Sequence, residues 1–462
     1  MNRRMLGITV LGDYIVSEGP QIVLENLLRI GATAVAINPT VTCQGDRSTG
    51  KFQPPSDAGH SPRKFDRPLF GKHALWVRSA PSFHPRSELY PESPYRPRQT
   101  NELTDELGGL IGQFIDACLG EGIDVYLQVG AAEPSGLRDE DRPRLPDGSL
   151  PSGRIADVGS LASPAIRAYN RAYANDLAAA YPKVTGFRID WPEYPCYTPD
   201  EIFQDFSPHA EKFANTAGFD FTAIRDCVLA FLERINGHLS NDDLAAPATL
   251  LEEFPDLRTW LNLKAALSRD LISGWKAVVD SLAGGPKKLS LHSFPPPFSS
   301  LTGFDYAAAA KMCDSISPKF YTMHWCLVVH GWGGWLLERN PSLDEPSLTS
   351  ALLKALNLVD EIPPRPTLAD FAYPQPDQSH PVGAQAQLAK IEEVLAAVAG
   401  RVPVYPLVHG YGPPQDFACR LRSVLKEPIA GVWINRYGYL SDEKLNSIAN
   451  TLAEYPLLHP DR

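Results

Sequence analysis

The sequence lacks several features that would assign it to a class of protein at once. Its seven cysteines never form a C-x-x-C pair, which argues against a disulfide framework or a structural zinc site and for reduced thiols in a cytoplasm. No apolar run approaches the ~20 residues of a membrane-spanning helix. The N-terminal residues also lack the apolar core of a signal peptide. We therefore expect a soluble, cytoplasmic protein.

Excess positive charge is also missing. The 43 Lys and Arg residues stand against 54 Asp and Glu residues, which gives a formal net charge of −11. Without a basic cluster, the chain has no electrostatic footprint for nucleic acid or for an anionic membrane. A small or neutral partner is expected instead, and the composition leaves a homo-oligomer open.

Proline is the residue that the chain has in excess. It occurs 43 times in 462 residues, about twice the average usage of ~5%. Two stretches are dense in it, Pro54–Pro97 and Pro363–Pro381. Neither has helical or alternating periodicity, so we expect long loop insertions at about 40–100 and 360–382.

Between these loops, short β-rich runs alternate with amphipathic helical patterns. Eight strands are expected at 6–11, 33–37, 124–129, 184–190, 288–292, 316–323, 402–409 and 431–435. Eight strands alternating with eight helices predict a (β/α)8 TIM barrel of the α/β class, with residues 1–462 in a single domain. A doubly wound sheet with a second domain is the alternative, but VLGDY replaces the G-x-G-x-x-G expected after its first strand.

Catalytic residues of such barrels lie at the C-terminal ends of the strands. Aromatic rings there can stack on sugar rings, while amide, imidazole and guanidinium groups can bind hydroxyls, so the mixture suits a carbohydrate. The candidate substrate-binding residues are Asp13, Asn38, Gln128, Trp191, His292, Tyr321, His324, Trp325, His409, Tyr411, Asn435 and Arg436.

The segment GFRIDWPEYP at 186–195 is the most specific motif. Its apolar strand ends in Asp190, which an aromatic residue and a proline follow. Glycoside hydrolysis needs two carboxyl groups, one to protonate the leaving oxygen and one to attack the anomeric carbon or activate water. Asp190 is the candidate for the attacking carboxylate, and Glu193 or Glu133 for the acid. Pairing of Asp190 with Arg188, or a turn cap, is the structural alternative.

GFRID resembles the strand-four signature of the α-amylase superfamily, in which the aspartate is the nucleophile. The longer D-x-x-x-Y-P pattern, Asp190 to Pro195, is similar to glycoside-hydrolase-like barrel families, as is the segment Leu289–Tyr321. The resemblance implies a glycoside hydrolase, or a transglycosidase, without a cofactor. The chain departs from the amylase pattern after strands five and seven, where His292 and His409 replace acidic residues, so the acid is assigned by elimination.

Two other functions stay open. His292, His324 and His409 could converge with Asp190 on a divalent metal of a hydrolase or isomerase, although strand one lacks the usual His-x-His. The missing carboxylates also allow a carbohydrate-binding barrel without catalysis. Two structural expectations accompany these hypotheses. Aromatic residues of the loop at 54–97 are expected to line the site. Trp332 and Trp335 of HGWGGW, next to a glycine-rich turn, are expected either to form a mobile lid or to pack in the core.

Overall fold

Eight parallel strands form a closed barrel in the computed structural model, which describes residues 4–60, 64–358, 360 and 363–455. Around the barrel the order is β1, β2, β6, β7, β8, β9, β10 and β11, and β11 pairs with β1. The strands are β1 (Met5–Val10), β2 (Ala34–Ile37), β6 (Asp124–Gly130), β7 (Gly186–Asp190), β8 (Lys288–Ser293), β9 (Ser315–Phe320), β10 (Leu407–His409) and β11 (Gly431–Asn435). This confirms the predicted (β/α)8 TIM barrel.

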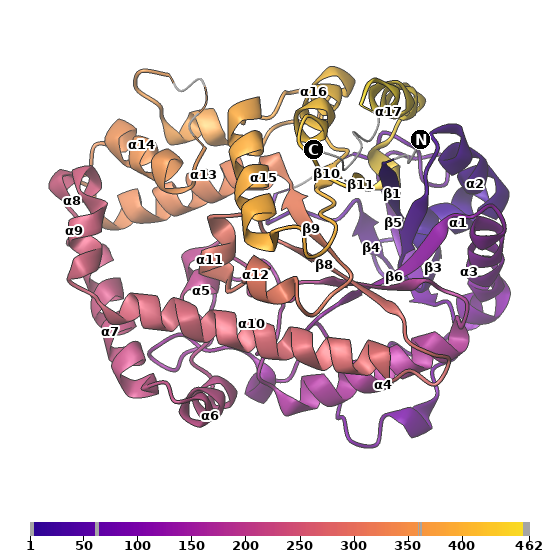
Figure 1. Cartoon of the computed structure of the whole chain (residues 1–462), viewed down its shortest axis with the longest axis horizontal. Helices are drawn as coiled ribbons and strands as arrows, with labels where there is room; N and C mark the ends of the chain where they lie inside the picture. The colour runs from indigo at the N-terminus through magenta and orange to yellow at the C-terminus, as the bar shows by residue number, and fades with distance from the viewer. Residues whose placement is uncertain (1–3, 61–63, 359, 361–362, 456–462) are drawn as a thin grey trace.

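Helices surround the barrel, and the first and last strands of the chain close it side by side (Figure 1). The longer helices are α2 (Pro20–Arg29), α3 (Glu102–Gly120), α4 (Pro164–Ala180), α6 (Pro208–Ala217), α7 (Phe221–Ile235), α10 (Asp256–Asp280), α13 (Thr322–Arg339), α14 (Glu345–Ala355), α15 (Ala384–Val398), α16 (Pro414–Leu425) and α17 (Asp442–Glu454). The shorter ones are α1 (Gly12–Glu18), α5 (Pro199–Ile202), α8 (Asn241–Ala245), α9 (Pro247–Glu252), α11 (Phe298–Thr302) and α12 (Tyr306–Ala309).

Local sequence explains where the helices begin. Ser163 precedes α4, and its side chain accepts a hydrogen bond from the N–H of Ile166, while Pro164 occupies the first helical position. Asp220 caps α7 in the same way through the N–H of Ala223. These caps satisfy N–H groups that have no partner inside the helix.

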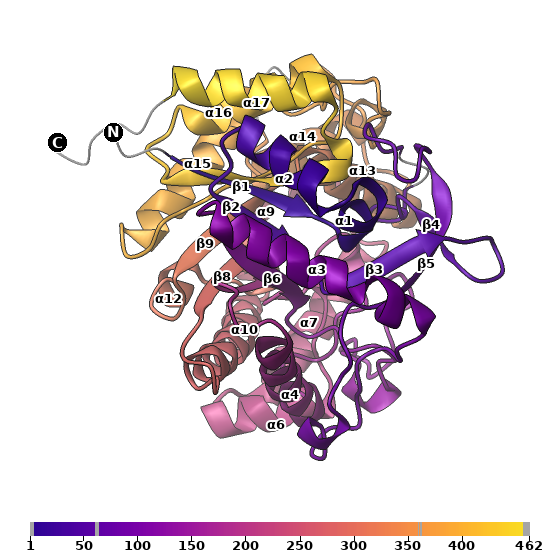
Figure 2. The same ribbon diagram turned by 90° about the vertical axis from the view of Figure 1, so that its right-hand side faces the viewer.

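The first proline-rich stretch contains regular structure, so the prediction of a plain loop at 54–97 is wrong in part. Strands β3 (Thr40–Gln44), β5 (Leu75–Pro81) and β4 (Lys51–Gln53) form an antiparallel sheet, which we call the insert sheet. Figure 2 shows it at one side of the molecule, beside the barrel. The strand β5 was missed because Arg78 and the flanking prolines interrupt its apolar pattern.

The predicted bounds of strands six and seven differ most from the structure. Strand six ends at Phe320 instead of Met323, because Thr322 begins the buried helix α13. A short apolar run fits a buried helix as well as a strand, so periodicity could not separate the two. Strand seven contains only Leu407–His409, because Pro403 and Pro406 interrupt the ladder with residues that have no N–H.

The HGWGGW segment is part of α13, so it forms neither a glycine-rich turn nor a lid. Gly333 lies against the short helix η3 (Leu368–Phe371), and a Cβ atom at this glycine would come within 2.3 Å of Leu368 Cδ2. The glycine therefore permits close packing of the second proline-rich segment on α13. Trp332 donates its indole N–H to the carbonyl oxygen of Cys196 at 3.1 Å, which agrees with the packing alternative.

The structure also bears on the cysteines and on membrane-spanning helices. All seven cysteines are free. Within the described residues, no helix combines the length and the apolar character that a membrane crossing requires. That the whole chain forms one domain, and that it is cytoplasmic, remain predictions.

Candidate active site

A cavity of about 390 Å³ opens where the barrel strands end. Its lining includes eight of the predicted site residues: Gln128, Asp190, Trp191, Tyr321, His324, His409, Asn435 and Arg436. The other lining residues are Ser56, Asp57, Ala58, Gly59, Arg154, Ile155, Ala156, Tyr197 and Lys319. The strand ends β6, β7, β9, β10 and β11 thus contribute to one site, as the barrel topology predicts.

Asp190 ends β7 and has one quarter of its side chain exposed. Its Oδ1 lies 2.7 Å from Lys319 Nζ and accepts a hydrogen bond of 3.0 Å from the N–H of Trp191. Burial alone would raise the pKa of Asp190, but the neighbouring His292 and Lys319, together with the hydrogen bonds that Asp190 accepts, outweigh it and hold the pKa below its ordinary value. Asp190 is therefore ionised at neutral pH and can attack or act as a base. Its partner is Lys319, and Arg188 lies in the barrel below, with its guanidinium over Trp433.

Trp191 holds Lys319 from the other side. The ammonium lies 3.7 Å from the centre of the indole ring, a favourable cation–π contact. Trp191 has a φ of +56°, a left-handed conformation that is costly for a bulky residue. Such strain is concentrated at functional sites, where the surrounding structure maintains it. Here it turns the chain immediately after Asp190 so that the ring covers the lysine.

His292 lies beneath Asp190, with Nδ1 3.3 Å from Asp190 Oδ1, and it does not line the cavity. The residue is fully buried, and burial lowers its pKa to about 3. The imidazole is consequently neutral at ordinary pH. Lys319, rather than His292, supplies the positive charge beside the carboxylate.

Glu133 follows the neighbouring strand β6. Gly130, the last residue of that strand, is paired in register with Asp190. A Cβ atom at Gly130 would lie 2.2 Å from Glu133 Oε2, so the Glu133 carboxyl group lies directly over this glycine. Because neighbouring strands are about 5 Å apart, the two carboxyl groups are on the order of 5–10 Å from each other.

The two carboxyl groups differ in protonation. Glu133 is exposed to a second, open cavity, while its carboxyl end is packed against Gly130. This burial, together with the negative charge of Asp190, raises the pKa of Glu133 to about 8. One group is thus ionised and the other protonated near pH 7, which is the division of roles that acid–base catalysis requires.

Glu193, the other candidate acid, is fully buried and does not line the cavity. Its carboxyl group accepts hydrogen bonds from the N–H of Phe294, at 2.7 Å, and from the hydroxyl of Thr302. Burial raises its pKa to about 8. Both oxygens are used to join the loops after β7 and β8, so Glu193 positions the loop that carries Trp191.

A chain of hydrogen-bonded side chains forms another part of the cavity wall. The Tyr197 hydroxyl is 2.8 Å from His324 Nδ1, and His324 Nε2 is 2.8 Å from Asp57 Oδ2. Tyr373 also donates its hydroxyl to Asp57 Oδ2 at 2.7 Å. On the same side, His409 Nδ1 accepts the N–H of Tyr411. These bonds fix the orientations of both imidazole rings, and they engage both ring nitrogens of His324.

Four further predicted residues lie outside the cavity lining. Asn38 Oδ1 accepts the N–H of Gly12 at 2.9 Å, and burial raises the pKa of Asp13 to about 6. Trp325 packs between Phe298 and Phe320 inside α13, and the Tyr411 hydroxyl donates to the carbonyl oxygen of Pro374. Each of these side chains supports the walls instead of facing a ligand.

Of the lining residues that were missed in the sequence, four have a charged or phenolic side chain: Lys319, Asp57, Tyr197 and Arg154. Lys319 had a recognisable signature, a lysine inside an otherwise buried strand. Asp57, Tyr197 and Arg154 lie in loops whose sequence carries no comparable pattern. Of the aromatic loop at 54–97, the segment 56–59 lines the cavity, while Phe65, Phe83 and Tyr90 are buried in the core, so the predicted aromatic wall is wrong.

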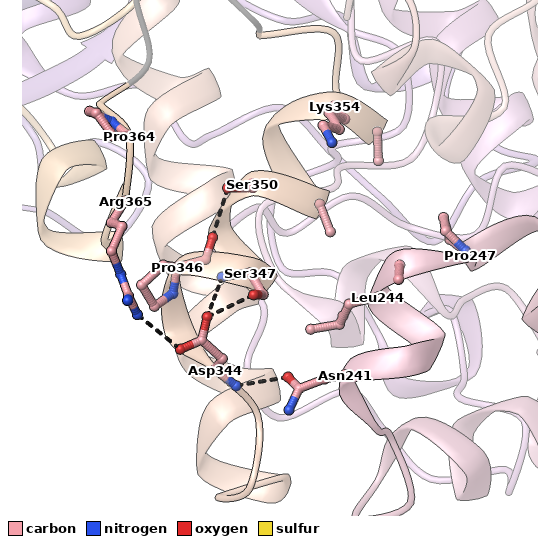
Figure 3. Close-up of a pocket in the computed structure, with 13 residues that line it drawn as sticks. Asn241, Leu244, Pro247, Asp344, Pro346, Ser347, Ser350, Lys354, Pro364 and Arg365 are labelled. Carbon is pink, nitrogen blue, oxygen red and sulfur yellow. Dashed lines mark hydrogen bonds and ion pairs between the residues drawn. The ribbon is translucent and has the colours of Figure 1, made fainter.

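The largest cavity described here, of about 870 Å³, is a groove far from the strand ends, between α8 and α14. Figure 3 shows that Asp344 already accepts from Ser347 and pairs with Arg365, while its N–H donates to Asn241. The polar groups in this groove satisfy one another. Size alone therefore does not identify the site.

The three histidines do not converge on a common point. His292 is buried under Asp190, and His324 and His409 are engaged as described above. In the part of the chain that the structure describes, no group of three His, Cys, Asp or Glu side chains is arranged to hold a metal ion.

Comparison with known proteins supports the fold. No protein-family model and no curated protein sequence matches the chain. Among solved structures, β-galactosidase from the psychrophilic Marinomonas ef1 is similar, with a TM-score of 0.53, 11% identity and 97% of this chain covered. The chain spans 59% of the length of that enzyme.

Two other solved structures are also glycoside hydrolases by name. The β-amylase catalytic domain from Paenibacillus polymyxa has a TM-score of 0.48 and 11% identity, covering 98% of both chains. A class V chitinase from Pseudomonas fluorescens has a TM-score of 0.41 and 10% identity, covering 97% of this chain and 99% of its own. The comparison with β-galactosidase supports the barrel fold alone.

Proposed function

We propose that the protein cleaves a glycosidic bond in a small or oligomeric carbohydrate, as a hydrolase or transglycosidase. One observation carries the proposal: Asp190 ends β7, and the carboxyl group of Glu133 lies over Gly130, the residue of the neighbouring strand β6 that is paired with Asp190. The pKa of Asp190 is lowered and that of Glu133 is raised. Glycosidases need two carboxyl groups with this difference in pKa, on opposite sides of the bond to be broken.

Asp190 supplies the attacking carboxylate. It forms a bond to the anomeric carbon, or removes a proton from the water that does, while positive charge develops on the sugar ring. The Lys319 ammonium keeps Asp190 ionised and orients one of its oxygens. Lys319 and the N–H of Trp191 both contact Oδ1, and we assign Oδ2 to the substrate.

Glu133 supplies the proton. Its raised pKa keeps the carboxyl group protonated near neutral pH, so it can protonate the glycosidic oxygen as the bond breaks. The polar lining, with Gln128, His409 and Asn435, provides donors and acceptors for the sugar hydroxyls, and Trp191 and Tyr321 provide aromatic surface. None of these roles needs a cofactor.

A panel of aryl glycosides tests the proposal. Purified protein is incubated with 4-nitrophenyl α- and β-glycosides of common hexoses and pentoses, and release of nitrophenol is followed. We expect turnover of at least one glycoside, lost in Asp190→Asn. Binding of sugars in calorimetry without turnover of aryl glycosides or oligosaccharides would instead favour a carbohydrate-binding barrel. Loss of turnover on chelation, restored by a metal, would favour the metal-dependent alternative.

A further inference from the structure

A second cavity adjoins the candidate active site. It has a volume of about 730 Å³ and lies between the insert sheet and the loop after β6. Its lining residues are Ser48, Thr49, Gly50, Lys51, Val77, Arg78, Ser79, Arg98, Glu133, Pro134, Ser135, Gly136 and Asp157. Glu133, the proposed acid, is therefore a wall of this cavity, whereas Asp190 lines the first one.

Consecutive residues of one short segment line the two cavities. Arg154, Ile155 and Ala156 line the first cavity, and the next residue, Asp157, lines the second. The charges of Asp190 and Lys319 act on Glu133 across this boundary. The bond to be cleaved would consequently lie between the cavities, with Asp190 on one side and Glu133 on the other.

The chemistry of the acid fixes which part of the substrate each cavity takes. The acid protonates the oxygen that departs with the leaving group, while the attacking carboxylate contacts the sugar that keeps the anomeric carbon. The cavity beside Glu133 is thus on the leaving-group side. Its hydroxyl-bearing rim, Ser48, Thr49 and Ser79, suits a sugar.

Charge in the second cavity is not balanced. Arg78 is paired with Glu102 at 2.7 Å, and Asp157 is paired with Arg142 at 2.7 Å. Lys51 and Arg98 have no carboxylate partner among the residues described; Arg98 contacts only the hydroxyl of Ser79, at 3.4 Å. Two uncompensated cations thus face a cavity of a protein whose net charge is −11.

Glu133 does not offset these cations at neutral pH. Burial raises its pKa to about 8, so its carboxyl group is mainly protonated there. The cavity carries an excess of positive charge, which attracts a negatively charged group on an incoming ligand.

We propose that the second cavity is a leaving-group subsite for a sugar that carries an anionic substituent, a carboxylate or a sulfate, held by Lys51 and Arg98. This inference deepens the proposed glycosidase function and rests on it for the assignment of the leaving-group side. The anion-binding property itself depends only on the cavity.

Binding of single sugars tests the subsite. Glucuronate, galacturonate and galactose 6-sulfate are titrated into the full chain by calorimetry, beside glucose and galactose. We expect at least one anionic sugar to bind at least about tenfold more tightly than its neutral parent, with binding that weakens as salt increases. The uronates and the sulfate distinguish the two sources of the anion.

Variants locate the binding. The double variant Lys51→Gln, Arg98→Gln should lose about tenfold in affinity for the anionic sugar, whereas Lys72→Gln, an exposed lysine of the same insertion outside the cavity, should bind like wild type. Lys51 and Arg98 are both exposed, so the double variant should fold. If its melting temperature is well below that of wild type, the two single variants are measured instead. Equal binding by the double variant, or equal binding of neutral and anionic sugars, overturns the subsite.

The two proposals fail separately. If aryl glycosides are cleaved while anionic and neutral sugars bind alike, the subsite is wrong and the catalytic proposal stands. If anionic sugars bind through Lys51 and Arg98 while no glycoside is cleaved, the catalytic proposal is wrong and the anion site stands without its leaving-group assignment.

Discussion

Polar residues follow the barrel strands on two sides of the mouth, and the two sides differ. In the last residues of β7 and β9, Asp190 and Lys319 form an ion pair that faces a cavity, and Trp191, which has a strained backbone, packs on the lysine. After β1 and β2, Asp13 and Asn38 are turned into the wall, and Asn38 binds the backbone of Gly12. Position at a strand end is therefore insufficient; a functional residue also needs a charge partner and access to a cavity.

The same difference separates two carboxylates only three residues apart. Asp190 keeps an open side toward the cavity, whereas Glu193 uses both oxygens to bind Phe294 and Thr302. We expect changes at Asp190 to alter catalysis and changes at Glu193 to alter folding stability.

The largest effect is expected for Asp190→Asn. The substitution keeps the shape of the side chain but removes the negative charge, so kcat/KM for the best aryl glycoside should fall at least about a thousandfold. The melting temperature should stay within a few degrees of wild type. A variant that is well folded and turns over substrate at a near wild-type rate would make Asp190 a structural residue.

Lys319→Met should have the next largest effect. Without the ammonium, burial of Asp190 loses one of the interactions that oppose it, and the pKa of Asp190 should rise. The acidic limb of the pH profile of kcat/KM should move upward with it, which lowers activity most on the acidic side of the optimum, on the order of tenfold. An acidic limb that does not move would show that Lys319 does not control this carboxylate.

Glu193→Gln should leave kcat nearly unchanged and alter the pH dependence of stability. The pKa of Glu193 is about 8 in the folded protein, above its ordinary value, so the bound proton stabilises the fold. That contribution is complete below the pKa of the unfolded chain and is lost as pH rises through about 8.

Denaturant titrations of the free energy of unfolding at pH 5–9 measure this contribution. Wild type should lose stability as pH rises, and Glu193→Gln should lose less; part of the slope should remain, because the pKa of Glu133 is raised as well. Identical slopes for the two proteins would contradict the assignment to Glu193.

The smallest kinetic effect is expected for Asn38→Ala on the other side of the mouth. The substitution leaves the N–H of Gly12 without its partner, which should cost about 1–3 kcal/mol in the free energy of unfolding. The pH profile and KM should stay as in wild type. A changed KM would place Asn38 among the residues that contact the substrate.

Much of the fold could be predicted from the sequence, because each barrel strand is a short apolar run between turn residues. β11, for example, begins and ends where the pattern predicts, at 431–435. The insert sheet could not be predicted, since its edge strands alternate polar and apolar residues irregularly and pair only within the tertiary structure.

The site could be predicted in part. Asp190 was found because a carboxylate ends an apolar strand, and the end of the strand determines where it points. Asp57 and Arg154 were missed, because their place depends on how long loops fold over the barrel. Choosing between Glu133 and Glu193 required burial and hydrogen-bond partners, which the sequence does not encode locally.

The most direct test of the account is the pH profile of kcat/KM for wild type and Glu133→Gln on the same aryl glycoside. The account predicts a bell in wild type, with a basic limb at about pH 8 as Glu133 loses its proton, and predicts that the variant lacks this limb. The remaining activity of the variant should be lower at every pH below 8. A basic limb that persists unchanged in Glu133→Gln would contradict the assignment of the acid and, with it, the proposed carboxylate pair.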